Sequence, residues 1–231
     1  MSELSWRREV NDVMRHDMRT RVGIGKGYVS MLLGHYEQMT PEQRAAALRG
    51  IADAVDRLDV FSRRVLMDEK LETRDLELQR GDVAVAELVA AAAAEHPGVV
   101  VAAGELPETA FLDPVVVREI LDNLLANAVA AAPQGTPVTL RAECVGGVLR
   151  FEVHDEGDGV TEADLPVLFR RYGRTEHSRR TSAAGLGLGL SIVRRLAEAC
   201  GGTCGVEIGA GTTFWVRLPV SPNDVLTPGG S

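Results

Sequence analysis

The sequence lacks any apolar run near the ~20 residues that a membrane-spanning helix requires. Residues 1–9 also lack the apolar core of a secretory signal peptide. We therefore predict that this chain contains no transmembrane segment and no secretory leader, and we expect a cytoplasmic location.

Basic residues and cysteines are both scarce. The 25 Lys and Arg residues are outnumbered by 33 Asp and Glu residues, which gives a formal net charge of −8. Nucleic-acid binding depends on a basic surface, so this balance argues against a nucleic-acid partner. Of the three cysteines, Cys200 and Cys204 lie four residues apart, but no Cys or His cluster completes a metal-ligand set. We therefore expect free, buried thiols.

The sequence does contain enough apolar material for one large or two modest domains. Hydrophobic residues make up 45% and charged residues 25% of its 231 positions, which is ordinary for a soluble globular protein. Residues 1–72 carry helical periodicity, residues 73–80 form a joint, and residues 81–220 alternate between helix and strand signals. We expect residues 221–231, rich in Pro and Gly, to be a disordered tail.

Two long helices are predicted before the joint. The first covers residues 5–38, and the second starts at Pro41 with Thr40 as N-cap and Gln43 closing a capping box. Apolar residues recur along the first helix at steps of three and four and along the second with heptad spacing. The two stripes comprise Met14, Met18, Val22, Gly25, Val29, Leu32 and Tyr36, and then Leu48, Ile51, Val55, Leu58, Ser62 and Val65. We expect an antiparallel hairpin that pairs with a second copy as a homodimeric four-helix bundle.

His16 stands on the first helix about 200° from both Met14 and Met18, so it faces away from the apolar stripe. An exposed histidine beside Asp17 is available for chemistry, although an ordinary surface pair is the plainer interpretation of these residues alone. Three glycines follow with no strand before them, so we interpret them as a bendable helix segment and not as a nucleotide loop. They are Gly23, Gly25 and Gly27.

Beyond the joint, short strand and helix signals alternate. We predict strands at 76–78, 99–102, around Phe111, 137–144, 148–154, 203–208 and 212–218, and helices at 82–95 and 114–131. Asp113-Pro114 is the cap and first residue of the second of these helices, and Gly146-Gly147 is a hairpin turn. The protein is thus expected to be α+β overall.

Residues 184–193, Ala-Gly-Leu-Gly-Leu-Gly-Leu-Ser-Ile-Val, place alternating glycines directly before an apolar helix start. Gly185, Gly187 and Gly189 would let backbone N–H groups approach an anion, and the helix would direct its positive end toward that anion. Plain backbone geometry explains such a turn equally well when the turn is taken alone.

Two further clusters bear on a nucleotide site. Glu119, Asn123 and Asn127 are spaced by four on a predicted helix, so they share one face. That face either holds Mg²⁺ and phosphate through oxygen ligands or simply meets solvent. Asp155 ends a predicted strand, where a carboxylate can accept a hydrogen bond from an exocyclic base amine. A calcium loop is the alternative there, but the ligand spacing and terminal glutamate of an EF-hand are missing.

Five motifs, taken together and in this order, resemble the N, G1, F, G2 and last glycine boxes of the bacterial sensor histidine kinases. They are Asn123-Leu-Leu-Ala-Asn127-Ala, Asp155-x-Gly157-x-Gly159, Phe169-Arg170-Arg171-Tyr172, Gly185-Leu-Gly187-Leu-Gly189-Leu-Ser-Ile and Gly211-Thr212-Thr213-Phe214. His16-Asp17-Met18-Arg19-Thr20 then resembles the H box. The resemblance covers residues 4–219.

This resemblance implies a dimerisation and phosphoacceptor hairpin followed by a GHKL (Bergerat-type) α/β sandwich of the kind shared with gyrase and heat-shock chaperone ATPases. The implied cofactors are ATP and Mg²⁺. In the family pattern Asp155 binds the adenine amine, while Asn123 and Asn127 hold Mg²⁺ and phosphates. The G2 glycines contact phosphates, Arg174 belongs to a lid over ATP, and Thr212 lies in the last glycine box.

The same resemblance implies an enzyme, an ATP-dependent protein histidine kinase. A ring nitrogen of His16 would attack the γ-phosphorus, and the phosphoryl group would pass to an aspartate of a response regulator receiver domain. Asp17 can bond the other ring nitrogen, and Asp17 with Thr20 resembles the motif that orients water to dephosphorylate the regulator. Gyrase-type ATPases have a glutamate base at the position of Asn123, so the amide suits transfer to histidine over hydrolysis.

Three departures from the family pattern stand out. Arg21 replaces a usual proline, and Ala130 replaces a common phosphate-binding lysine. The third departure is the lack of a sensor domain in this sequence, so we expect that the input is missing or lies on another chain or in a longer parent. Two other functions stay open: a histidine phosphotransfer adaptor that no longer binds ATP, and a GHKL ATPase or protein serine kinase. The intact glycine boxes oppose the first, and Asn123 with the context of His16 opposes the second.

Overall fold

A computed structural model describes the backbone of residues 3–73, 76–157, 160–173, 175 and 187–220, and the side chains of all of these except residues 3–17, 21 and 57. The chain divides into two compact units, Met1–Glu69 and Lys70–Ser231.

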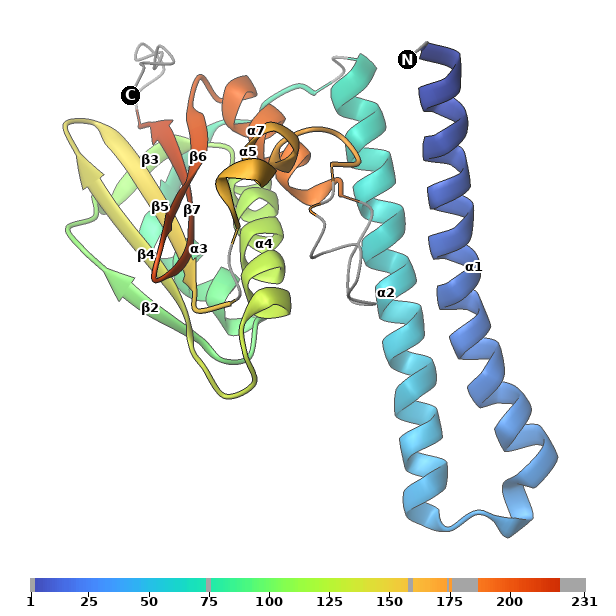
Figure 1. Ribbon diagram of the computed structural model, residues 1–231. Helices are drawn as coiled ribbons and strands as arrows, with labels where there is room; N and C mark the ends of the chain where they lie inside the picture. The colour runs from blue at the N-terminus through green and yellow to red at the C-terminus, as the bar shows by residue number, and fades with distance from the viewer. Residues whose placement is uncertain (1–2, 74–75, 158–159, 174, 176–186, 221–231) are drawn as a thin grey trace. The chain divides into compact units, whose positions relative to one another are not determined.

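The first unit consists of helix α1 and most of helix α2, joined as a hairpin (Figure 1). Helix α1 spans Glu3–His35 and continues as the 3₁₀ helix η1, Tyr36–Gln38, before α2 begins at Pro41–Thr73. The predicted capping box is present, because the N–H of Thr40 donates to Oε1 of Gln43 at 2.9 Å and the N–H of Gln43 donates to Oγ1 of Thr40 at 3.3 Å. Helix α1 passes through its three glycines without a break.

Small residues close the hairpin. The buried apolar side chains of α2 within this unit recur every seven residues. They are Ala47, Ala54 and Phe61. A side chain at Gly50 would overlap the ring of Tyr28, so the helices approach closely there. The predicted heptad stripe lies beside this packed face and not on it, because Leu48 and Val55 expose 59% and 58% of their surface.

The second unit is an α/β sandwich (Figure 1). A five-stranded sheet runs in the order β2-β4-β5-β7-β6, and β1 pairs with β3 separately. The strands are β1 Gly81–Ala84, β2 Val99–Ala103, β3 Thr109–Leu112, β4 Val138–Val145, β5 Val148–Asp155, β6 Thr203–Gly209 and β7 Gly211–Pro219. The helices are α3 Val85–Ala94, α4 Pro114–Ala131, α5 Leu165–Leu168 and α7 Gly189–Ala199, with the 3₁₀ helix η2 at Glu162–Asp164. The predicted α+β class is confirmed.

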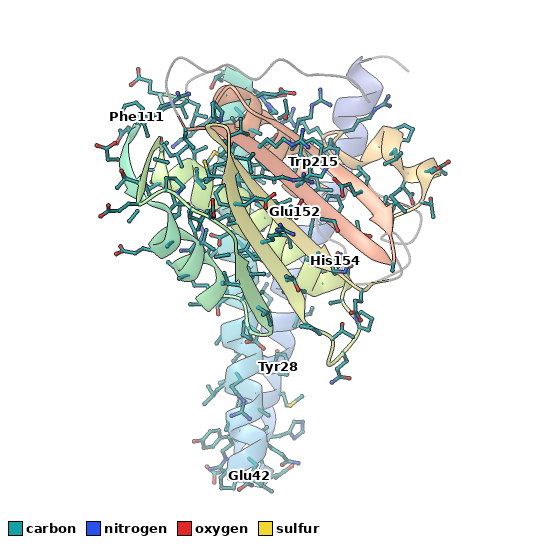
Figure 2. All side chains as sticks on the ribbon, turned by 90° about the vertical axis from the view of Figure 1, so that its left-hand side faces the viewer. Tyr28, Glu42, Phe111, Glu152, His154 and Trp215 are labelled. Atoms are coloured by element: carbon teal, nitrogen blue, oxygen red, sulfur yellow. The ribbon has the colours of Figure 1, made fainter. Side chains whose placement is uncertain are left out.

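One face of the five-stranded sheet forms the core. Strand β5 alternates strictly along its length and buries Phe151 and Val153 completely. Helices α3, α4 and α7 cover this face (Figure 1). The opposite face carries Glu152, His154 and Trp215, which Figure 2 labels on the side turned toward the viewer. The sheet therefore has one apolar and one polar face, as expected for a two-layer sandwich.

The strand predicted at residues 76–78 is wrong. Residues 76–80 have no regular secondary structure, and the strand lies at Gly81–Ala84, where it pairs with β3. The N–H of Gln79 donates instead to Oδ2 of Asp113 at 2.7 Å, so this backbone is committed to a side chain at the start of α4. Because strand β1 occupies residues 81–84, the helix expected from residue 82 begins at Val85. The other predicted helices and strands are present within one or two residues.

All three cysteines are free: Cys200 is buried, and Cys144 and Cys204 are half-buried. Burial raises the pKa of the Cys200 thiol to about 11 and that of Cys204 to about 12. Both thiols therefore stay protonated and unreactive near neutral pH. Among the helices within the described residues, none combines the length and the apolar character needed to cross a membrane.

Candidate functional site

Helix α4 turns two amide oxygens toward the start of helix α7. Asn123 and Asn127 lie one turn apart on α4, as the sequence predicted. A Cβ atom placed on Gly189 would come 3.1 Å from Oδ1 of Asn123 and 3.9 Å from Oδ1 of Asn127. Gly189 thus leaves open the space that both oxygens face.

The amide of Asn123 is buried and held in one orientation. Asn123 is 2% exposed. Its Nδ2 donates one hydrogen bond to the backbone oxygen of Glu119 at 2.8 Å and one to Oε1 of Glu119 at 2.9 Å. Oδ1 is buried without a hydrogen-bond partner among the described residues. Such an acceptor costs ~1–3 kcal/mol when it stays unpaired, so it calls for a ligand. A neutral carbonyl oxygen is a donor that Mg²⁺ accepts, and the site therefore fits that cation.

The start of α7 provides backbone N–H groups. Within the described chain, no side chain caps the first turn of α7, and the hydroxyl of Ser191 donates backward to the carbonyl of Leu188 at 2.8 Å. The N–H groups at such a helix start bind anions, phosphate included. Gly187 precedes this turn with a φ of 70°, and a Cβ there would come 2.5 Å from the carbonyl oxygen of Gly173. Only glycine suits that position.

A buried carboxylate closes the other side of the site. Asp155 ends β5 at 1% exposure and lies opposite Thr212 of β7, which is 2% exposed. Burial raises the pKa of Asp155 above its ordinary 3.8, against the lowering effects of the Gly157 hydrogen bond and of His154. Oγ1 of Thr212 accepts a hydrogen bond from the N–H of Val160 at 3.2 Å. The carboxylate and the hydroxyl thus lie together where β5 ends and the neighbouring strand β7 begins.

The turn after β5 packs directly on helix α4. A Cβ on Gly157 would come 2.5 Å from the carbonyl oxygen of Ala131, the last residue of α4. The close approach joins Asp155 to the helix that carries Asn123 and Asn127. One site is therefore built from α4, the end of β5, the start of β7 and the start of α7.

Comparison with known proteins assigns this site to a family. Residues 112–222 match the family described as histidine kinase-, DNA gyrase B-, and HSP90-like ATPase. The chain is 34% identical over 229 residues to the histidine protein kinase DivJ of Caulobacter vibrioides, across 93% of this chain and 38% of DivJ. These matches support a bacterial sensor histidine kinase catalytic core. The family resemblance seen in the sequence is thereby confirmed.

Two solved structures are similar to this chain. Full-length ShkA in complex with AMPPNP superposes with a TM-score of 0.62 at 28% identity, covering 90% of this chain and 45% of ShkA. The histidine kinase AdeS of Acinetobacter baumannii superposes with a TM-score of 0.67 at 18% identity, covering 90% and 98% of the two chains, and shares the fold. The chain spans less than half the length of DivJ and ShkA.

The remaining predicted site residues lie on helix α1 or beyond the described chain. His16 and Asp17 belong to α1, and their side chains lie outside the described residues. Thr20 follows one turn later and is exposed. Arg21 stands within the continuous helix α1, at the position of the family's proline. Three further predicted residues, Gly159, Arg174 and Gly185, lie outside the described residues, as does the expected tail at 221–231.

Two contributors to this site were not predicted from the sequence. Gly173, which directly precedes the predicted lid residue Arg174, packs backbone to backbone against Gly187. The preceding residue, Tyr172, has a φ of 59°, which is unusual for a residue other than glycine. Val160 supplies the N–H that binds Thr212, a contact between residues 52 positions apart that no local pattern reveals.

Proposed function

We propose that this chain is an ATP-dependent protein histidine kinase that autophosphorylates on His16 and passes the phosphoryl group to an aspartate of a response regulator receiver domain. The observation that carries the proposal is the unpartnered oxygen of Asn123 beside the uncapped start of α7. An oxygen ligand for a cation and N–H groups for an anion are what a Mg²⁺–nucleotide complex requires.

The nucleotide would lie between the strand ends and helix α7. Asp155 accepts a hydrogen bond from the exocyclic amine of adenine, and Thr212 lies opposite it. Asn123 and Asn127 would hold Mg²⁺, which when bound supplies positive charge beside the transferred phosphoryl group. The glycines at the start of α7 leave room for the phosphates, and the family pattern adds Gly159, Arg174 and Gly185 to the same site.

The reaction would use residues of the hairpin as well. A ring nitrogen of His16 forms a bond to the γ-phosphorus while the bond between that phosphorus and the β,γ-bridging oxygen breaks, and ADP leaves. Asp17 accepts a hydrogen bond from the N–H of the other ring nitrogen and thereby fixes the tautomer of His16. Asn123 is an amide and cannot activate water as a base, which favours transfer to histidine over hydrolysis. Asp17 with Thr20 would orient water when the phosphorylated regulator docks.

The domain assignments belong to the same proposal. Residues 1–72 would dimerise and carry the phosphoacceptor, residues 73–80 would link the units, and residues 81–220 would bind ATP. The exposed apolar side chains of Leu48 and Val55 support a homodimer, because an isolated hairpin leaves them in water. The net charge of −8 supports a protein partner over nucleic acid, and a cytoplasmic location would give access to ATP and to the regulator.

Autophosphorylation on His16 can be tested with ATP labelled on the γ-phosphate and with Mg²⁺. The label should be stable to alkali and labile to acid, as expected for phosphohistidine. His16→Gln should abolish it, whereas His35→Gln should retain it, because His35 is an exposed histidine near the other end of the same helix. Equal labelling of the His16 variant would reject the assignment, and acid-stable label would point to a serine kinase.

Nucleotide titration separates the kinase from the adaptor that no longer binds ATP. The kinase should bind ATP, and its dissociation constant for ATP should fall when Mg²⁺ is added. Failure to bind ATP at millimolar concentration would favour the adaptor.

A further inference from the structure

Glu119 supplies two acceptors to one buried amide. It lies one turn before Asn123 on α4, and its backbone oxygen and its Oε1 receive the two N–H groups of Asn123 at 2.8 and 2.9 Å. Both donors of the amide are therefore used by a single residue. The backbone contact is available to any residue at position 119, whereas the second contact depends on the side chain.

The backbone oxygen and the carboxylate of Glu119 together favour one orientation of the Asn123 amide, and the carboxylate is the part that a substitution can remove. An amide that rotates by half a turn exchanges its nitrogen and its oxygen. In the rotated state the amide oxygen would face the backbone oxygen and Oε1 of Glu119, with no hydrogen between any of the three acceptors. That arrangement is strongly unfavourable because two hydrogen bonds, one of them to a charged group, are replaced by repulsion.

The selected orientation points the oxygen of Asn123 into the nucleotide site. Oδ1 lies 3.1 Å from the position that a Cβ on Gly189 would occupy, and it is buried without a hydrogen-bond partner within the described chain. The rotated amide would present N–H groups at this place, and a cation repels those. Orientation of this one group therefore decides whether the site accepts a metal ion through Asn123.

We infer that Glu119 is a positioning residue, which acts through Asn123 to keep a carbonyl oxygen directed at the Mg²⁺ of the bound nucleotide. The inference rests on the proposed function. Residues that hold a metal ligand from behind typically change metal affinity by about 10- to 100-fold when they are lost. The role is the more important here because Ala130 replaces the phosphate-binding lysine of the family, which leaves more of the phosphate charge to the cation.

The test measures ATP binding by the full chain in two ways. In one series the concentration of free Mg²⁺ is varied, and in the other EDTA replaces Mg²⁺. Glu119→Ala and Glu119→Met remove the side-chain acceptor, and Glu119→Gln keeps an oxygen that can accept the same hydrogen bond. Position 119 is half-buried on a helix, and both Ala and Met are good helix formers, so folding should persist. Glu87→Ala on α3 is the matched control, because it removes an exposed carboxylate from another helix of the same unit.

We expect Glu119→Ala and Glu119→Met to raise the Mg²⁺ concentration for half-maximal ATP binding by about tenfold or more. ATP affinity in EDTA should stay unchanged, and Glu119→Gln should remain within about threefold of the native chain because an amide oxygen is an adequate acceptor. A general structural role would instead weaken binding equally with and without Mg²⁺. That result, or an unchanged Mg²⁺ response in the Ala and Met variants, would overturn the inference alone. A native chain that binds no ATP would overturn the proposed function and this inference with it.

Discussion

The N–H of Gly157 donates a 2.9 Å hydrogen bond to Oδ1 of Asp155, two residues earlier in the chain. The carbonyl oxygen of Ala131 occupies the space where a side chain at position 157 would lie. The turn at Gly157 is thus held between the end of α4 and the buried carboxylate of Asp155. A substitution at Gly157 should therefore disturb both the packing on α4 and the position of that carboxylate.

Gly157→Ala should weaken nucleotide binding and destabilise the fold. Its Cβ would come 2.5 Å from the oxygen of Ala131 and 2.7 Å from Oδ1 of Asp155, so the turn must shift. Such overpacking typically lowers the free energy of unfolding by ~1–3 kcal/mol. Urea denaturation and ATP titration measure the two effects. Gly81→Ala is the control, because a Cβ at Gly81 meets no atom within 4 Å, and equal effects of the two variants would contradict the steric argument.

Asp155→Asn should stabilise the nucleotide-free protein at neutral pH while impairing ATP binding. Burial raises the pKa of Asp155, so its contribution to stability is fully present below the ordinary value of 3.8 and is lost as the pH rises through the folded-state pKa. The uncharged amide avoids that loss. With one oxygen engaged by the N–H of Gly157, however, the amide presents donors to the adenine amine, and ATP affinity should fall about tenfold or more.

Unfolding curves recorded from pH 4 to pH 8 check the stability of Asp155→Asn. The difference between the variant and the native chain should be largest at pH 7 and should shrink toward pH 4. A variant less stable than the native chain at pH 7 would show that burial is not the dominant influence on Asp155.

Thr20→Ala and Asp17→Asn should separate the two activities proposed for the hairpin. Thr20 is four residues beyond His16 and shares its face one turn on, so it can orient water at a docked aspartyl phosphate. Thr20→Ala should retain most autophosphorylation and lose regulator dephosphorylation. Asp17→Asn should slow autophosphorylation by the ~10²-fold or more that accompanies loss of a general base. Both rates are measured with a phosphorylatable regulator, and similar loss of autophosphorylation in both variants would refute the division.

Val55→Glu should weaken the homodimer of the full chain. Val55 is 58% exposed on the hairpin, and a charge placed in an interface that covers it would be desolvated. We expect a dimer dissociation constant at least about tenfold higher, as 1.4 kcal/mol or more would produce. Val60→Glu makes the same chemical change at a 40% exposed residue about 140° away on α2 and should dimerise normally. Light scattering across a concentration series would distinguish them, and an unaltered Val55 variant would place the interface elsewhere.

Local patterns in the sequence were sufficient to predict most helices and strands. The start of α4 follows from Asp113 and Pro114, because a cap and a first-turn proline act within a few residues. The Thr40 capping box follows for the same reason. The strand expected at residues 76–78 failed because an acceptor 34 positions away, Asp113, binds the N–H of Gln79. The partner of that backbone group could not be seen locally.

The sequence by itself determined the family, the order of its motifs and the face of α4 that carries Glu119, Asn123 and Asn127, because helical spacing and short motifs are local properties. Tertiary structure decided how those groups are used. It set Asp155 opposite Thr212, pressed Gly157 onto the end of α4, and put Gly189 in front of the Asn123 oxygen. It also closed the hairpin on Ala47 and Ala54 and left Leu48 and Val55 outside. These relations join residues that are distant in the chain, and only close packing of the folded backbone brings them within a few ångströms of each other.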